Sequence, residues 1–183
     1  MNAKIYGILG SAFLCMSFIP AVSILFTILG LIFLGISLNL YSKENEKIFN
    51  YFLIASILAF VSSMLFYFKL VAVITSMILS LLSSNPIIPI TLSIIIYFSV
   101  YYVLQIISAV YFKKSFYLLG ELFNNKLLKT GGLFLVAGAV LNIFFIGLIV
   151  WTLGWLLIML GFFTIEEIID AEIIEDVKLI EKD

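Results

Sequence analysis

The sequence predicts an all-α integral membrane protein with about six transmembrane helices, in which two helical hairpins flank two central spans. Three observations support this fold class. Of the 183 residues, 64% are apolar and only 11% are charged, whereas soluble domains are about half apolar and about a quarter charged. The apolar residues gather in runs long enough to cross a bilayer. The lysines gather between those runs, as is typical of cytoplasmic loops.

The first apolar stretch, residues 5–41, would be about 55 Å long as one helix, which is too long for a single crossing of about 30 Å. Pro20 should break it, because proline lacks an amide donor and clashes with the preceding helical turn. We therefore expect spans at about 5–18 and 21–41. The first span is close to the lower length limit, so a hairpin that crosses the bilayer only in part stays an alternative.

The two central spans are expected at about 48–68 and 90–111. Residues 70–84 between them are also apolar, and three alternatives stay open for this segment: an extension of the preceding helix, a helix at the membrane interface, or a re-entrant segment. The next segment, NPIIP at 85–89, has two prolines and an asparagine, which is typical of a turn or a helix start.

The segment at 112–128 is expected to be the main cytoplasmic loop. Asn124 and Asn125 favour a turn within it, since asparagine tolerates left-handed backbone geometry. Before this turn the fourth helix should continue beyond the bilayer to about Glu121, because apolar residues recur at helical spacing. These residues are Phe112, Phe116, Leu119, Phe123 and Leu127.

A second long apolar stretch, residues 129–165, also exceeds the length of one crossing. We place its break near Gly147, which gives spans at 129–145 and 147–165. Residues 1–165 thus form a single transmembrane domain.

An acidic tail, residues 166–183, follows the last span. It carries eight acids and two lysines, and its apolar residues have helical spacing. Two alternatives stay open: an amphipathic helix that docks on a partner or on the cytoplasmic loop, and a solvated tail.

Lysine positions predict the orientation, because cytoplasmic loops are enriched in lysine. With the N-terminus inside, six spans leave seven of the eight lysines before the tail in the cytoplasm, and Lys69 is the exception. A further span at 70–84 would move the loop lysines outside, so we reject it. The predicted location is the cell membrane, multi-pass, with both termini cytoplasmic. The loop lysines can reach anionic lipid headgroups; they are Lys113, Lys114, Lys126 and Lys129.

Small residues seven positions apart mark two candidate helix-packing seams, because seven residues are nearly two helical turns. Close backbone approach along such faces holds membrane helices together. A shift of the chain by 124 residues also overlays Gly7 on Gly131 and Gly30 on Gly154, which indicates a repeat of the two hairpins. The seam residues are Ser23, Gly30 and Ser37 in the first hairpin and Gly147, Gly154 and Gly161 in the second.

Four polar residues of the span at 90–111 share one helix face at membrane depth and form a candidate polar stripe. One interpretation is a solute path or a small polar pocket. The other, which the sequence favours, is hydrogen bonding to neighbouring helices through Asn39, Asn142 or Ser62, because such bonds commonly join membrane helices. The stripe residues are Tyr97, Tyr101, Gln105 and Ser108.

The sequence offers no reactive site. It has no histidine, one cysteine (Cys15) and no cluster of acids within the spans. We therefore expect no metal site, no cofactor and no catalytic nucleophile. Lysine carries all the positive charge, and no nucleic-acid-binding motif is present. The prediction is a protein that is not an enzyme and does not bind nucleic acid.

Three segments carry a family resemblance. They are GILGSAFLCMSFIPAVSILFTILGLIFLGISL (7–38), KSFYLLGELFNNKLLKTGGLFLVAGAVL (114–141) and GWLLIMLGFFTI (154–165). They resemble the first hairpin, the loop with its following helix, and the last span of an uncharacterised family of prokaryotic polytopic membrane proteins, domain of unknown function 996. The resemblance implies the same architecture. That family has no established activity, so it implies no site residue.

Two function classes follow. The small-residue seams and the lack of reactive groups favour a non-catalytic membrane scaffold, assembly factor or subunit, with a second copy or another membrane protein as its partner. The alternative is a small-solute transporter or channel. A repeat of the hairpins permits this alternative, since repeats occur in transporters, but no charged group at mid-membrane depth supports it.

Overall fold

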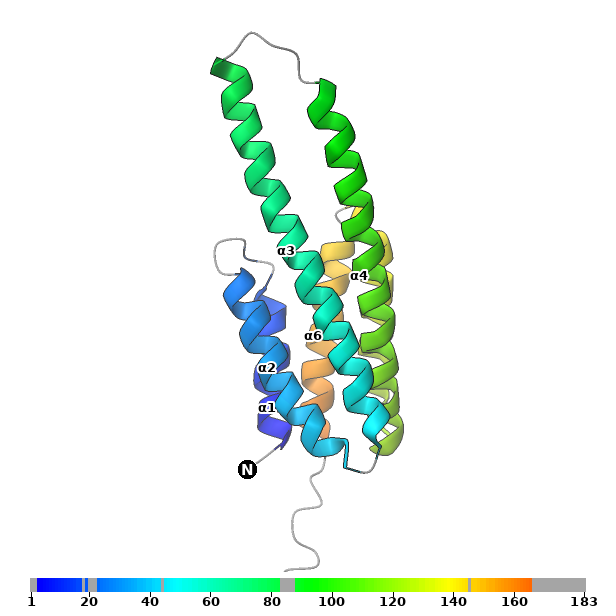
Figure 1. Cartoon of the computed structure of the whole chain (residues 1–183). Coiled ribbons are helices and arrows are strands. Elements are labelled where there is room, and N and C mark those ends of the chain that lie inside the picture. The colour runs from blue at the N-terminus through cyan, green and yellow to red at the C-terminus, as the bar shows by residue number, and fades with distance from the viewer. Residues whose placement is uncertain are drawn as a thin grey trace, which may run out of the picture.

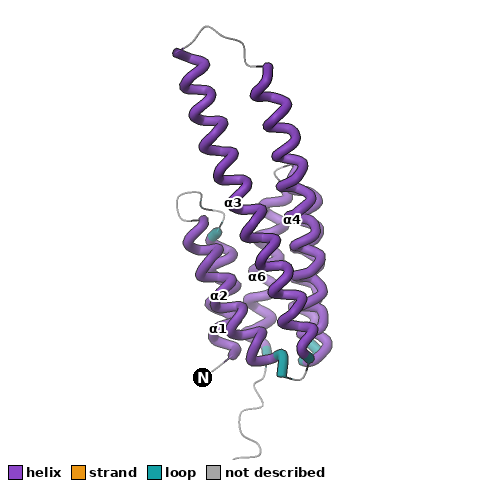
Figure 2. The backbone as a smooth tube through the Cα atoms, viewed as in Figure 1, coloured by secondary structure: helices purple, strands orange, loops and turns teal. Residues whose placement is uncertain are grey.

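The computed structural model is a bundle of α-helices, and the residues that it describes contain no strand, which confirms the all-α class (Figures 1 and 2). Described are residues 3–17, 19, 23–43, 45–82, 88–144 and 146–165, without the side chains of 66–70, 72–73 and 76–97. The elements are α1 (Ala3–Met16), α2 (Ser23–Tyr41), α3 (Glu46–Leu82), α4 (Ile88–Leu122), α5 (Lys126–Leu141), a 3-10 turn η1 (Asn142–Phe144) and α6 (Ile146–Thr164).

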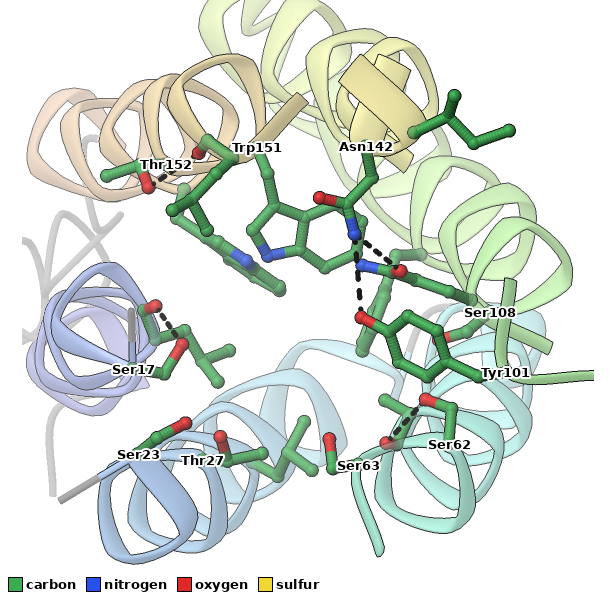
Figure 3. A pocket seen from close by; sticks show the side chains of 18 of the residues that line it. Ser17, Ser23, Thr27, Ser62, Ser63, Tyr101, Ser108, Asn142, Trp151 and Thr152 are labelled. Carbon is green, nitrogen blue, oxygen red and sulfur yellow. Dashed lines mark hydrogen bonds between the residues drawn. The ribbon is translucent and has the colours of Figure 1, made fainter. Parts of the chain in front are cut away.

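The helices form a closed ring. Each helix packs against the next one along the chain, and α6 packs against α1 to close the circle. The view along the bundle in Figure 3 shows this ring of helices around a central space. Three antiparallel hairpins therefore make up the molecule, namely α1–α2, α3–α4 and α5–α6, with the loops of the first and third hairpins at the same end.

The central hairpin is much longer than the other two. Helix α3 has 37 residues and α4 has 35, so both exceed 50 Å at about 1.5 Å per residue. Figure 1 shows both helices extending beyond the rest of the bundle. Residues 70–82 belong to α3 without a break, so this segment extends the preceding helix. Helix α4 ends at Leu122, next to the predicted Glu121.

The outer surface of the ring is apolar. Exposed large residues such as Leu25, Val103 and Ile149 cover its helices. Among the described residues, four helical segments are long and apolar enough to cross a membrane: Ser23–Tyr41, Glu46–Leu65, Lys126–Phe144 and Ile146–Thr164. Helix α1 is apolar but shorter. These features identify a helical membrane protein, whereas the count of six full spans stays a prediction.

Charged residues gather at one end of the ring. Helices α1, α3 and α5 begin at this end, and α2, α4 and α6 finish there. Lys4, Lys47 and Lys126 lie in the first turns of their helices, and Lys43 lies two residues after the end of α2. Lys4 Nζ donates a 2.9 Å hydrogen bond to the carbonyl of Ile165 and so joins α1 to the end of α6. We name this end the lysine-rich end.

The turn between α4 and α5 has the predicted asparagine geometry. Asn124 has a φ of 47°, in the left-handed region that asparagine tolerates. Asn125 caps α5, because its side-chain oxygen accepts hydrogen bonds from the amides of Leu127 and Leu128 at 3.0 and 3.3 Å. Its side-chain amide also donates to Gly161 O at 2.9 Å. One asparagine thus joins the start of α5 to the end of α6.

Two further breaks separate the helices at the opposite end. Helix α1 ends before Pro20 and α2 begins after it. Pro20 itself lies outside the described residues. The break in the second long apolar stretch begins at η1, five residues before Gly147. Gly147 lies in the first turn of α6, where a Cβ atom would collide with the backbone of Asn142. Its role is therefore close packing and not helix termination.

The predicted seam residues lie mainly at contacts within the two short hairpins. A Cβ on Gly30 of α2 would lie 2.9 Å from Gly10 O of α1, and Ser37 Oγ donates to Ala3 O at 2.8 Å. In the second hairpin, a Cβ on Gly154 of α6 would lie 3.1 Å from Gly131 O of α5. Gly161 likewise packs on α5, against Leu128. Both hairpins therefore use their glycines to bring two helix backbones together.

The interior near the lysine-rich end is filled by aromatic rings. Phe112 and Phe116 of α4 both pack edge-on against Trp155 of α6, with ring centroids 5.3 and 5.9 Å apart. Phe116 also packs against Phe162. Phe162 lies nearly two turns after Trp155 in α6, closer to the lysine-rich end. All four rings are buried. We call these four rings the aromatic floor, because they lie inside the ring of helices near its lysine-rich end.

Candidate functional site

A cavity of about 640 Å³ lies inside the ring, in the half remote from the lysine-rich end. Five helices and η1 contribute to its wall (Figure 3). Phe112 and Trp155 of the aromatic floor form its base. Its polar lining residues are Ser17 from the turn after α1, Ser23 and Thr27 from α2, Ser62 and Ser63 from α3, Tyr101, Gln105 and Ser108 from α4, Asn142 from η1 and Thr152 from α6.

Three of the four residues of the predicted polar stripe line this cavity: Tyr101, Gln105 and Ser108. The side chain of Tyr97 lies outside the described residues. The three described stripe residues thus face the centre of the ring. Of the predicted seam residues, Ser23 alone also lines the cavity, and the other five lie at helix contacts.

The stripe residues also bond to neighbouring elements. Asn142 Nδ2 donates to Gln105 Oε1 at 2.9 Å and to the hydroxyl of Tyr101 at 3.5 Å. Ser108 Oγ donates to Ala55 O of α3 at 2.8 Å. The same side chains therefore join α4 to α3 and η1 and form one wall of the cavity. Asn142 is the partner named from the sequence, whereas Ser62 bonds to Ala59 O of its own helix.

The opposite wall offers hydroxyl groups. Ser17 and Thr152 donate to carbonyls of their own helices, Leu14 O at 2.7 Å and Leu148 O at 2.9 Å. Thr27 and Ser63 make no hydrogen bond within the described part of the chain. A molecule in the cavity would therefore meet two hydroxyl groups that can donate and accept.

Both tryptophans of the chain line the cavity. Trp155 is only 1% exposed and packs in the aromatic floor. Figure 3 shows the indole of Trp151 above the centre of the ring. Trp151 is held close to α5, because a Cβ on Gly138 would lie 2.5 Å from its backbone nitrogen. The two indoles make tryptophan fluorescence a reporter of this cavity.

None of the described residues that line the cavity is charged. Among the described residues there is also no cluster of histidine, cysteine or acidic side chains that could hold a metal ion. Cys15 is buried and lies 3.9 Å, measured from its sulfur, from the carbonyl oxygen of Thr152. The arrangement can thus hold an uncharged molecule by hydrogen bonds and apolar contact.

Sequence reasoning missed most of this wall. It identified one face of α4 but not the hydroxyl residues of α2 and α3 that complete the cavity. Thr27 and Ser63 are 36 positions apart and carry no motif that links them. The available signal was collective: several neutral polar residues lie in apolar spans, on the halves that are remote from the lysines.

Comparison with known proteins gives one match. The model of a family described as "Protein of unknown function (DUF996)" matches residues 26–156. This region is more than half of the chain and runs from α2 into α6, so it includes most of the cavity wall. No curated protein and no solved structure matches the chain.

Proposed function

The chain belongs to the DUF996 family, and from its central cavity we propose that it is a non-catalytic membrane protein that binds a small uncharged molecule inside its helical ring, in the manner of a small-solute transporter. The observation that carries the proposal is the central cavity, whose described polar lining is neutral and comes from α2, α3, α4, α6, η1 and the turn after α1. Its volume of about 640 Å³ is within the usual range of small-molecule sites, roughly 300–1,000 Å³.

The lining supports an uncharged ligand. A charge in a membrane interior is costly unless an opposite charge or a dense set of dipoles accompanies it. The described side chains of the cavity wall supply hydroxyl, amide and indole groups and neither ammonium nor carboxylate. Tyr101, Gln105 and Asn142 can orient one polar group of a ligand, and Phe112 and Trp155 offer apolar surface below it.

The structure weakens the argument for a scaffold, assembly factor or subunit. This function class was favoured by the small-residue seams and by the lack of reactive groups. Gly30 packs on α1 and Gly154 packs on α5, so both seams are occupied inside the chain. The seams therefore give no support to an external partner, and binding to a second copy or to another membrane protein needs a different surface.

The aromatic floor favours a carrier over an open channel. Phe112, Phe116, Trp155 and Phe162 fill the ring between the cavity and the lysine-rich end. A solute that enters the cavity reaches a closed base. Passage to the other side would require these rings to move, as alternating access requires.

The proposed orientation places the lysine-rich end and both termini in the cytoplasm of a cell-membrane protein, following the lysine distribution. Lys113, Lys114, Lys126 and Lys129 then lie near cytoplasmic headgroups and can contact anionic lipid. Lys114 Nζ lies 5.1 Å from the ring centre of Tyr111, so part of its charge is already balanced by a cation–π contact.

The experiment uses the full chain in bilayer vesicles and intrinsic tryptophan fluorescence. Three bromine-labelled quenchers are compared: a long-chain alcohol, an alkyl sulfonate of equal length and a phospholipid. The proposal predicts saturable quenching by the alcohol, little by the sulfonate, and a weak, non-saturable effect of the phospholipid. Equal quenching by all three would show that the tryptophans merely face lipid, and would refute the proposal.

A pair of variants assigns the quenching to the cavity. Ala59 lines the cavity on α3, and Ile57 lies two positions away on the same helix with 57% of its side chain exposed to the outside. Ala59→Phe should abolish saturable quenching because it fills the cavity, whereas Ile57→Phe should leave it unchanged. Saturable quenching that survives Ala59→Phe would place the alcohol outside the cavity.

A further inference from the structure

A second, much smaller hollow lies at the junction of α2 and α3. Ile24, Thr27 and Ile28 line it from α2, and Phe60, Ser63 and Met64 line it from α3. Thr27 and Ser63 also line the central cavity. The two hollows thus share these two side chains, and Figure 3 shows Thr27 on α2 and Ser63 on α3.

The α2–α3 junction is the least extensive contact between neighbouring helices of the ring. Other junctions have specific joining contacts. Gly30 brings α2 onto α1, Gly154 brings α6 onto α5, and Ser108 bonds α4 to α3. At the α2–α3 junction the glycine is Gly35, and a Cβ on it would approach Phe52 no closer than 3.5 Å, which is ordinary contact. This junction can therefore open at lower cost than its neighbours.

The polarity of the junction changes from outside to inside. Its outer lips are apolar and partly exposed: Ile24 is 37% exposed and Phe60 is 39% exposed. Behind the lips stand the hydroxyls of Thr27 and Ser63, which make no hydrogen bond within the described residues. A molecule that moves inward thus meets apolar surface first, then two hydroxyls, then the cavity with its hydrogen-bonding wall.

From this geometry we propose that the α2–α3 junction is a lateral portal, through which an uncharged amphipathic molecule dissolved in the bilayer reaches the cavity. The proposal rests on the proposed function and adds the source and chemical class of the ligand. Apolar lips select a molecule with an apolar body, because they would exclude a strongly hydrated solute. The two hydroxyls can exchange hydrogen bonds with its polar group as it passes.

The side chains at the outer edge of the junction can move while the helical bundle stays intact. Met64 has a flexible side chain that adapts to different shapes. No seam glycine lies among the six residues of the outer hollow. Opening therefore requires side chains of Ile24, Phe60 and Met64 to shift, while the glycine contacts of the α1–α2 and α5–α6 hairpins stay intact.

The test closes the portal reversibly. Ile24→Cys and Met64→Cys are combined with Cys15→Ala, which removes the only native cysteine. The full chain is placed in vesicles, the two thiols are joined by oxidation or by a short thiol cross-linker, and the joined fraction is measured on a gel. The probe is the brominated long-chain alcohol, and the readout is the rate of tryptophan quenching after mixing.

Closure should slow quenching at least tenfold, and reduction should restore the rate of the open form. An unchanged rate in protein that the gel shows to be joined would overturn the portal, while saturable quenching in that protein would still support the cavity as a binding site. Absence of saturable quenching in both the open and the joined form would instead contradict the proposed function itself.

A second pair of variants needs no cross-link. Ser63→Phe places a ring at the portal, and Ile57→Phe places the same ring on the outer face of α3. The first should slow quenching by the alcohol at least tenfold, and the second should not change the rate. Equal rates for the two variants would refute the portal.

Discussion

The substitution Gly154→Leu tests whether the glycine seam holds the second hairpin together. A Cβ at this position would lie 2.9 Å from Cδ2 of Leu135, 3.0 Å from the backbone nitrogen of Leu135 and 3.1 Å from Gly131 O. Two of these three atoms belong to the backbone of α5 and cannot rotate away. A leucine at position 154 therefore has to push α5 and α6 apart along the seam.

The neighbouring residue gives a matched control. Leu153 is 42% exposed on the outer face of α6. Lipid chains can fill the space that Leu153→Ala leaves, so this variant should lower the free energy of unfolding by only about 0–1 kcal/mol. Overpacking costs about 1–3 kcal/mol, and Gly154→Leu belongs at the upper end because backbone atoms block it. At about 2–4 °C per kcal/mol for a chain of this size, Gly154→Leu should lower Tm by about 6–12 °C.

The assay is thermal melting in mild detergent, followed by tryptophan fluorescence, which reports the α6 side chain next to position 154. Gly154→Ala should give an intermediate loss, because it adds the Cβ without the rest of the leucine side chain. The reasoning is refuted if Gly154→Leu melts within about 2 °C of Leu153→Ala. In that case the α5–α6 contact would not depend on close backbone approach.

Three further predictions concern the lysine-rich end. Asn125→Ala should lower Tm by several degrees, because the lost N-cap costs about 1 kcal/mol and Gly161 O keeps only Thr164 Oγ1 of its two side-chain donors; an unchanged Tm would contradict this. Single cysteines at positions 126 and 87 should be labelled from outside intact cells only at 87, and the reverse pattern would overturn the orientation. Removal of residues 166–183 changes the net charge by +6. The shortened protein should bind anionic vesicles more strongly at low salt but not at high salt. Unchanged binding at low salt would show that the tail does not screen the loop lysines.

The sequence was sufficient for the fold class because length and composition determine it. Long runs of apolar residues favour helices. Every backbone amide and carbonyl must be hydrogen-bonded inside lipid, and a helix makes all of these bonds within its own segment. The turn at Asn124 and Asn125 was also readable, because few residues tolerate its left-handed geometry. Features of this kind depend on a few neighbouring residues, so a single sequence is enough to predict them.

The closed ring could not be read in the same way. In a soluble bundle the apolar stripe of each helix marks the inward face. Here Leu25 and Ile149 face outward and are as apolar as the buried Leu34 and Ile158, so apolar periodicity does not separate inside from outside. Which helices become neighbours depends on small residues and shape, and the closing contact of α6 on α1 joins residues more than 100 positions apart.

Polar residues within the apolar spans are the better guide to the inward face, and the structure shows both the strength and the limit of that rule. A neutral hydroxyl can bond to a carbonyl of its own helix, as Ser62 and Thr152 do, so lipid does not forbid it on any face. Such a residue taken alone therefore predicts nothing. Yet ten polar residues from four helices, η1 and the turn after α1 converge on one cavity, which local bonding does not require. Convergence of this kind needs a common cause, and an uncharged ligand with hydrogen-bonding groups supplies one that the two tryptophans can report.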